Sequence, residues 1–579
     1  MQNNRLKVFS MVVGSAVLLS ACNGLGKMVK KQNLVKFEVT PNPLEMHADS
    51  VAVSVSGKYP AKLFAKKAVV TVTPVIKYNG GERTLKPVTL VGEKATASGT
   101  KISYSKGGTF SYTDKTAYDP AMKTSKLEVR AKGQVKKKTK DFNGVEIGDG
   151  TIVTPLLVRN DEKAIFAKDN FVKVESANKT ASIYYLVNQS TVRPSELKSE
   201  EVKSMRDFIS NNINSRWYEF KGIEVSAYAS PDGELTLNEN LVKDRAKSGS
   251  QAMMNEFKGN SKNKSGNSFG REASQYKTAT TAEDWEGFKG MMQGSGLPDK
   301  DLVLRVLSMY TDPIQRETEI KNLSKTYKEI ADQILPKLRR SVITLMVDKK
   351  SRTDAEILQL CSSTPDSLNL EELLYGATLT EDLNIKTNVY KTAEQKFSSD
   401  WRTSNNLGVV YLMANKLDDA KAAFERASKS NSGSSIVMNN MGAVVAKSGD
   451  RRAAMGYFEK AKGAGPEVAY NTGIVQVRDG QYSQAVSSFG EYKGFNLALA
   501  QLLAGNPENV NATIDASKEK EMALCYYLKA VAAARKGDSA GLAALKTAIE
   551  KDGSLKSLAK DDCEFIKWRS NADFSSLTK

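Results

Sequence analysis

The sequence predicts a multidomain chain: an N-terminal all-β sandwich, a central α/β domain with a helical insertion, and a C-terminal all-α repeat solenoid. Three observations predict this order. Apolar residues first alternate with a period of two, strands and helices then mix, and a pattern with a period of 34 residues recurs near the end. The chain has 579 residues, well beyond a typical domain of about 100 to 200, so several cores are expected.

The composition excludes several classes of protein. Hydrophobic residues at 40% and charged residues at 26% are near globular averages, which argues against a collagen-like, wholly disordered or multi-spanning membrane protein. The net charge of +18 indicates an anionic partner without identifying it. The single histidine, His47, argues against histidine-dependent catalysis and multi-histidine metal sites. We therefore expect a non-enzyme with no metal and no cofactor.

Residues 1–21 have the features of an export signal. Arg5 and Lys7 form a basic start, and the apolar run Val12–Leu19 is too short to span a bilayer stably. The run ends in Leu19-Ser20-Ala21-Cys22, which resembles the lipobox of bacterial lipoproteins. That resemblance implies acylation of Cys22, palmitate included, and a lipidated tether over residues 22–33. The alternative is an ordinary cysteine beside a conventional cleavage site.

The residues after Cys22 indicate where the mature protein resides. Asn23 stands where an aspartate holds many lipoproteins at the inner membrane, and residues 24–31 carry lysines without an acidic cluster. In the Bacteroidota-type lipoproteins that the chain resembles, an acidic segment here would imply surface exposure. The resemblance therefore implies an outer-membrane lipoprotein on the periplasmic face.

Three further cysteines remain in the mature chain, Cys361, Cys525 and Cys563. No pair has the CxxC spacing of a redox or zinc motif. In an oxidising compartment, an odd number leaves at least one thiol free or in an intermolecular disulfide.

The region 34–160 predicts the β-sandwich. Val35, Phe37 and Val39 alternate with polar residues, as do later valine runs, so half-buried antiparallel strands are expected. About 13 of the 18 net positive charges lie in residues 23–160. The run Lys136–Lys138 with Lys140 fits contact with acidic lipid headgroups or another polyanion. Such a run is more often a solvated face or edge-strand protection.

The region 180–348 resembles the OmpA C-terminal-like domain, a peptidoglycan-associating module. The resemblance rests on the turn Asn188 to Pro194, a strand that enters the loop Ala229 to Gly233, the helical pattern Asn238 to Ala246 and the basic strand Leu338 to Leu345. A mostly helical insertion is expected over about 250–330, and residues 349–391 are expected to be a linker or helical connection.

The resemblance implies a site for the peptide stem of peptidoglycan. In the family, a loop aspartate and a helix arginine bind the amine and carboxylate of diaminopimelate. Arg245 matches the arginine, whereas Ser230 stands at the aspartate position and Asp232 is the nearest carboxylate. Asn238 and Arg245 are equally consistent with a scaffold that has lost the ligand.

The region 392–579 repeats with helical spacing and resembles the tetratricopeptide repeat. Such arrays stack into a solenoid whose concave groove binds peptides or partner proteins, so a docking surface is expected; a rigid spacer is the alternative. Small residues are expected to bring paired helices together, and Phe424 to fill the space beneath the next repeat. The repeat-packing residues are Leu407, Gly408, Tyr411, Ala420, Phe424, Ala427, Gly442, Ala454, Phe458, Ala461, Gly473, Ala485 and Phe489.

Together these features predict a non-catalytic periplasmic adaptor. It would be anchored by lipid, bind a protein partner on the solenoid, and contact peptidoglycan in the middle domain. A more specific hypothesis is an accessory subunit of an outer-membrane assembly or secretion machine, with a β-barrel complex as partner. A third is an envelope hydrolase using Glu283 and Asp284, although acidic pairs at helix ends are usually caps. Nucleic acid is disfavoured as a partner, because a lipid-anchored protein does not meet the genome and the basic strands lack an aromatic stacking platform.

Overall fold

The computed structural model describes residues 24–259 and 268–579. Cys22 and the expected signal peptide lie outside the described residues. The chain divides into two compact units, one formed by Met1–Lys168 with Lys386–Lys579 and the other by Asp169–Ile385. The β domain and the solenoid therefore belong to one unit, although the α/β domain separates them in the sequence. No described helix has the length and apolar character needed to cross a membrane.

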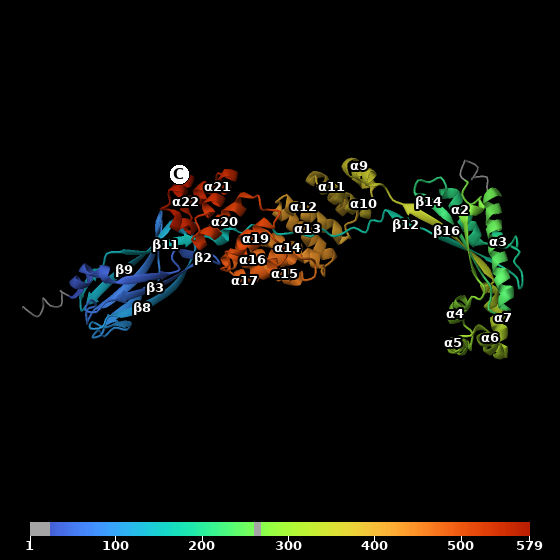
Figure 1. The fold of residues 1–579 in the computed structure, drawn as a ribbon, viewed down its shortest axis with the longest axis horizontal. Coiled ribbons are helices and arrows are strands. Elements are labelled where there is room, and N and C mark those ends of the chain that lie inside the picture. The colour runs from blue at the N-terminus through green and yellow to red at the C-terminus, as the bar shows by residue number, and fades with distance from the viewer. Residues whose placement is uncertain (1–23, 260–267) are drawn as a thin grey trace, which may run out of the picture. The chain divides into compact units, whose positions relative to one another are not determined.

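Eleven strands form the N-terminal β domain around one apolar core (Figure 1). They make one hydrogen-bonded network rather than the two separate sheets expected of a sandwich, because β2 pairs with β11. Most pairings are antiparallel, as expected, but β2–β11 and β6–β7 are parallel. The strands are β1 (Lys36–Thr40), β2 (Leu44–His47), β3 (Ser50–Tyr59), β4 (Val69–Tyr78), β5 (Gly81–Thr84), β6 (Val88–Gly92), β7 (Thr100–Ile102), β8 (Gly108–Ala117), β9 (Ser125–Val135), β10 (Lys138–Asp141) and β11 (Val145–Ile152).

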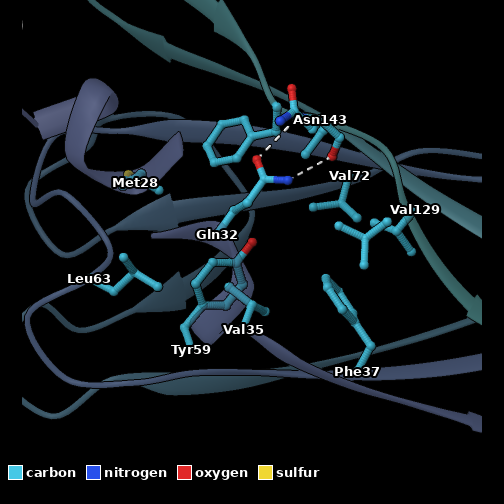
Figure 2. Close-up of a pocket in the computed structure, with 12 residues that line it drawn as sticks. Met28, Gln32, Val35, Phe37, Tyr59, Leu63, Val72, Val129 and Asn143 are labelled. Carbon is cyan, nitrogen blue, oxygen red and sulfur yellow. Dashed lines mark hydrogen bonds between the residues drawn. The ribbon is translucent and has the colours of Figure 1, made fainter. Parts of the chain in front are cut away.

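A short helix over residues 24–30 covers one end of this domain. Leu25 and Met28 are buried in the same core as the strands. Figure 2 shows Met28, Leu63 and Tyr59 beside an apolar pocket, with Gln32 directed toward Asn143. The Gln32 amide donates to the Asn143 carbonyl (3.0 Å) and accepts from its N–H (3.1 Å), which fixes the chain after the helix.

The C-terminal region is a solenoid of antiparallel helix pairs, which confirms the repeat prediction. Pairs form between α12 and α13, α14 and α15, α16 and α17, α18 and α19, and α20 and α21. The helices are α11 (Leu383–Lys396), α12 (Trp401–Met413), α13 (Leu417–Ser430), α14 (Ser435–Lys447), α15 (Arg451–Lys460), α16 (Glu467–Arg478), α17 (Tyr482–Phe489), α18 (Phe495–Leu503), α19 (Asn509–Asp515), α20 (Ala523–Lys536), α21 (Gly541–Lys551), α22 (Leu555–Asp561) and α23 (Ala572–Thr578).

The repeated glycines allow each pair of helices to approach closely. A Cβ at Gly408 would lie 2.5 Å from the Phe424 ring, and one at Gly442 would lie 2.5 Å from the Phe458 ring. Each phenylalanine therefore packs on the glycine of its own repeat, and not only beneath the next repeat as expected. The other repeat-packing residues predicted above are buried, except Tyr411, which is partly exposed.

The second unit contains a five-stranded sheet covered by α2 and α3. The order across the sheet is β12 and β13 on β16, then β14, then β15. Both helices share an apolar core with the sheet, through Val202 and Met205 of α2 and through Met253 and Phe257 of α3. The elements are β12 (Val174–Ser176), β13 (Lys179–Tyr184), α2 (Glu200–Asn212), β14 (Tyr218–Tyr228), α3 (Leu235–Gly259), β15 (Tyr276–Thr281) and β16 (Arg340–Lys350).

The expected helical insertion differs in its extent. Strand β15 lies inside the expected range of about 250–330, yet it pairs in parallel with β14 over six residues and belongs to the sheet. Short exposed strands of threonine and lysine give a weak sequence signal, which explains the difference. The helical part is α4 (Trp285–Gln293), α5 (Lys300–Met309), α6 (Pro313–Asn322), α7 (Ser324–Gln333) and α8 (Leu335–Leu338), and α9 (Asp354–Ser363) and α10 (Leu370–Gly376) follow β16.

Candidate functional site

An extended segment, residues 159–168, lies along the first helices of the repeats; we name it the connector. It follows the 3-10 helix Thr154–Leu157 and ends where the second unit begins. It forms no helix or strand, and its contacts proceed from α18 at Arg159 to α12 at Ala167. The connector therefore runs antiparallel to the order of the repeats: its first residue contacts a later repeat, and its last residues contact the first repeat.

Asparagines on four successive first helices bind the connector backbone. Asn406 of α12 accepts a hydrogen bond from the N–H of Ala167 (2.7 Å) and donates one to its carbonyl (3.0 Å). Asn406 therefore recognises the backbone of Ala167 and not its side chain. The same two bonds, 2.7 to 3.0 Å long, join Asn440 to Ile165, Asn471 to Lys163 and Asn496 to Arg159.

Two more asparagines link these contacts into a continuous ladder. Asn405 and Asn439 donate to the carbonyls of Ile165 (3.2 Å) and Lys163 (3.0 Å). Between repeats, Asn440 donates to Asn405 (2.9 Å) and Asn471 donates to Asn439 (3.0 Å). All six asparagines are at most 2% exposed. Removing the connector would leave buried amides without partners, at about 1 to 3 kcal/mol for each group.

Connector side chains add contacts specific to this chain. Glu162 is buried and pairs with Lys447 of α14 (3.3 Å). Burial raises the pKa of Glu162 above its ordinary value, against the attraction of Lys447. Asp161 accepts a hydrogen bond from the Tyr470 hydroxyl (2.8 Å), and the Lys163 ammonium lies 4.4 Å from the centre of the same ring.

On the first helices of the solenoid, the surface predicted for docking is occupied by the chain's own connector. The chain's own connector takes up the amide groups that would hold a foreign peptide. The sequence contained a signal for this ladder, since the pair Asn405 and Asn406 recurs after 34 residues as Asn439 and Asn440. Polar pairs inside an apolar helix indicate a bound partner, but not which peptide occupies the site.

The β domain also contacts the solenoid directly. Asp49 pairs with Arg451 of α15, and the His47 ring is hydrogen-bonded to the Tyr482 hydroxyl (2.7 Å). Thr154 donates to the Glu564 carboxylate, which Arg535 also binds. The only histidine of the chain, His47, thus joins the β domain to the solenoid within one unit.

In the second unit, the residues of the expected stem-peptide site gather around the loop after β14. Asn238 of α3 donates to the carbonyls of Ser230 (3.1 Å) and Gly233 (3.4 Å), which fixes the loop. Arg339 donates to the Ser230 hydroxyl (3.1 Å) and pairs with Asp232 (3.1 Å). The role of Arg339 was not predicted, and Asp232 already has a cationic partner.

Arg245 is the most buried charged residue of this site, at 1% exposure. Its guanidinium donates to the carbonyls of Gln189 (3.0 Å) and Tyr228 (2.9 Å). Among the described residues no carboxylate forms an ion pair with it, and burial lowers the pKa of Arg245 to about 10. The guanidinium carbon also lies 5.2 Å from the centre of the Tyr185 ring. A buried cation held by carbonyl dipoles and a ring favours an anionic ligand.

The helical insertion packs beside the same loop. Pro231 and Asp232 line a small pocket together with Trp285, Phe288 and Tyr327. The acidic pair proposed for hydrolysis has structural contacts. Asp284 caps α4 by accepting from the Gly287 N–H (2.9 Å) and pairs with Arg340 (2.9 Å), whereas Glu283 accepts from the Trp285 indole (3.0 Å).

Other reactive side chains in the described part of the chain are cysteines and acidic groups. Cys361, Cys525 and Cys563 are buried thiols without a disulfide. Burial raises the pKa of Cys361 and of Cys525 to about 11, so both are poor nucleophiles at neutral pH. Within residues 24–259 and 268–579, no group of three or more His, Cys, Asp or Glu side chains is arranged to hold a metal ion.

Neither a protein-family model nor a curated protein matches this chain. Among solved structures, YrrB, described as a TPR protein with an unusual peptide-binding site, is 18% identical and covers 35% of this chain and 94% of its own, with a TM-score of 0.21. PilW, a type IV pilus biogenesis factor, is 16% identical and covers 40% of this chain and 100% of its own (TM-score 0.27). A tetratricopeptide repeat protein from Parabacteroides merdae is 17% identical and covers 36% and 97% (TM-score 0.27).

Proposed function

We propose that this chain is a non-catalytic adaptor of the outer membrane, exposed to the periplasm and anchored by a lipid on Cys22. The observation that supports an adaptor most strongly is the asparagine ladder. It holds the connector, which lies in the sequence between the β domain and the second unit, along four successive helix pairs, from α12 to α18. The β domain and the solenoid thereby belong to one compact unit, and residues 169–385 form the other.

The partner of this adaptor is a protein that contacts the outer helices of the solenoid. The buried amides of the first helices are used by the connector, so a partner of the assembled solenoid meets α13, α15 and α17 instead. Exposed lysines on these helices, among them Lys421, Lys429 and Lys460, give sites for crosslinking.

Crosslinking in intact cells followed by mass spectrometry tests this proposal. We expect these lysines to crosslink to one dominant protein. An outer-membrane β-barrel as that protein would make the chain an accessory subunit of an assembly or secretion machine. Crosslinks only within the chain itself would contradict the adaptor function.

The lipid anchor has its own test. After a high-salt wash, Cys22→Ser should be found in the soluble periplasmic fraction and not in the outer-membrane fraction, because the lipobox predicts the covalent anchor. If the variant still sediments with outer membranes after a high-salt wash, the lipid is not the anchor.

Contact with peptidoglycan is the second part of the proposal. The uncompensated guanidinium of Arg245 supports it, because a stem-peptide carboxylate would supply the missing negative charge. The engagement of Asp232 by Arg339 weakens the amine half of the family's site. We therefore propose that Arg245 contributes most of the affinity.

A further inference from the structure

The end of the β domain that carries the helix over residues 24–30 is strongly basic. Five segments form this end: residues 24–31, 60–68, 92–95, 103–107 and 135–138. They carry eleven exposed lysines and one carboxylate, Glu93, which is a net charge of +10. The lysines are Lys27, Lys30, Lys31, Lys62, Lys66, Lys67, Lys94, Lys106, Lys136, Lys137 and Lys138.

Direct contacts bring these segments together into one surface. The Ala65 N–H donates to the Met28 sulfur (3.3 Å), and a Cβ at Gly133 would lie 2.9 Å from the Leu25 side chain. The short helix thus sits between the loop 60–68 and the β9–β10 hairpin. The backbone N–H of Lys94 donates to the Lys66 carbonyl (2.7 Å), and that of Lys62 to the Tyr104 carbonyl (2.6 Å).

This basic surface and the solenoid contacts lie at opposite ends of the same strands. Strand β3 runs from Ser50, next to the Asp49 that pairs with Arg451, to Tyr59, next to the basic loop. Strand β9 likewise runs from Ser125 to Val135 at the basic hairpin. Strands of ten and eleven residues span about 30 to 35 Å, so the basic surface faces away from the solenoid.

We propose that this surface docks on the anionic headgroups of a phospholipid membrane. The inference rests on the proposed lipid anchor, because Cys22 precedes the helix over residues 24–30, which contributes Lys27 and Lys30 to the basic surface. A lipid on Cys22, five residues before Lys27, would hold this surface close to the bilayer, where lysines within a Debye length of about 8 Å are attracted to anionic headgroups. Lipid and lysines then act as two membrane signals, and the β domain directs the solenoid into the periplasm.

The test measures sedimentation of the protein with vesicles. The protein is expressed without residues 1–22, which keeps every residue that the structure describes. Its binding to vesicles of phosphatidylcholine with phosphatidylglycerol is compared with binding to phosphatidylcholine alone. The triple variant Lys67→Gln, Lys136→Gln and Lys137→Gln should bind the anionic vesicles about a hundredfold more weakly, since each lysine near such a surface contributes about 1 kcal/mol.

A matched variant controls for total charge. Lys421→Gln, Lys429→Gln and Lys460→Gln remove the same charge from the exposed face of the solenoid and should leave vesicle binding unchanged. Equal binding of the protein to both kinds of vesicle, or equal loss in the two triple variants, would overturn the inference. These outcomes leave the fractionation of Cys22→Ser unaffected, so failure of the basic surface is distinguishable from failure of the lipid anchor.

Discussion

Asn440 and Ile165 lie 275 residues apart in the sequence and exchange two hydrogen bonds, each 2.8 Å long. This pair stands at the centre of the asparagine ladder, because Asn440 also donates to Asn405 of the preceding repeat. The relationship explains how two regions separated by a whole α/β domain form one unit. It also explains why the solenoid groove is filled.

Asn440→Ala should destabilise the first unit by about 1 to 3 kcal/mol, because it leaves buried polar groups of the connector without partners. Denaturant unfolding measures this loss. Asn511→Ala is the matched control, since Asn511 is exposed on α19. Equal stability of the two variants would show that the ladder does not hold the connector.

The free energy of unfolding of Glu162→Gln should increase relative to that of the wild type as the pH rises from the ordinary range of a carboxyl group to neutrality. Burial raises the pKa of Glu162, so in this window the folded chain binds more protons than the unfolded chain, and wild-type stability falls with rising pH. Unfolding of both proteins across the pH range measures the difference. Glu425→Gln, at an exposed position of α13, should leave the profile unchanged.

Gly442→Ala should destabilise the solenoid by about 1 to 3 kcal/mol, because its Cβ would lie 2.5 Å from the Phe458 ring and would force the paired helices apart. Thermal unfolding monitored by circular dichroism tests this. The control is Gly456→Ala on α15, where no atom lies within 4 Å of the new methyl group. That change should be neutral or stabilise by up to about 1 kcal/mol.

Arg245→Ala should weaken binding of the full chain to peptidoglycan by about one to two decades, the contribution of a charge-assisted hydrogen bond. Cosedimentation with purified sacculi measures binding. Asp232→Asn should cost less, since Asp232 is already paired with Arg339. The control Lys247→Ala changes an exposed charge on the same helix. Absence of wild-type binding at low salt would show that the site is only scaffold.

Periodicity in the sequence predicted the β domain and the repeats because each element has a regular apolar face. The glycine at 442 and the phenylalanine at 458 could be recognised for the same reason. The resemblance to the OmpA C-terminal-like domain also brought Ser230, Asp232, Asn238 and Arg245 to one region. It did not reveal that Arg339, which lies between α8 and β16 about 100 residues later, binds Asp232. Ion pairs between distant elements depend on the tertiary arrangement, which no local pattern encodes.

The connector was missed for a different reason. Residues 159–168 have no apolar period and form neither helix nor strand. They fall at the end of the predicted β domain (34–160) and in the unassigned interval before the predicted domain at 180. Their conformation is set by asparagines that follow more than 200 residues later. An extended segment held through its backbone leaves almost no signature in its own sequence.

Hydrogen–deuterium exchange across residues 159–168 tests the central claim most directly. The N–H groups of Arg159, Lys163, Ile165 and Ala167 donate to buried asparagines, so peptides covering the connector should exchange slowly, and Asn440→Ala should speed their exchange. Exchange of these amides in the wild type at the rate of an exposed loop would contradict the account.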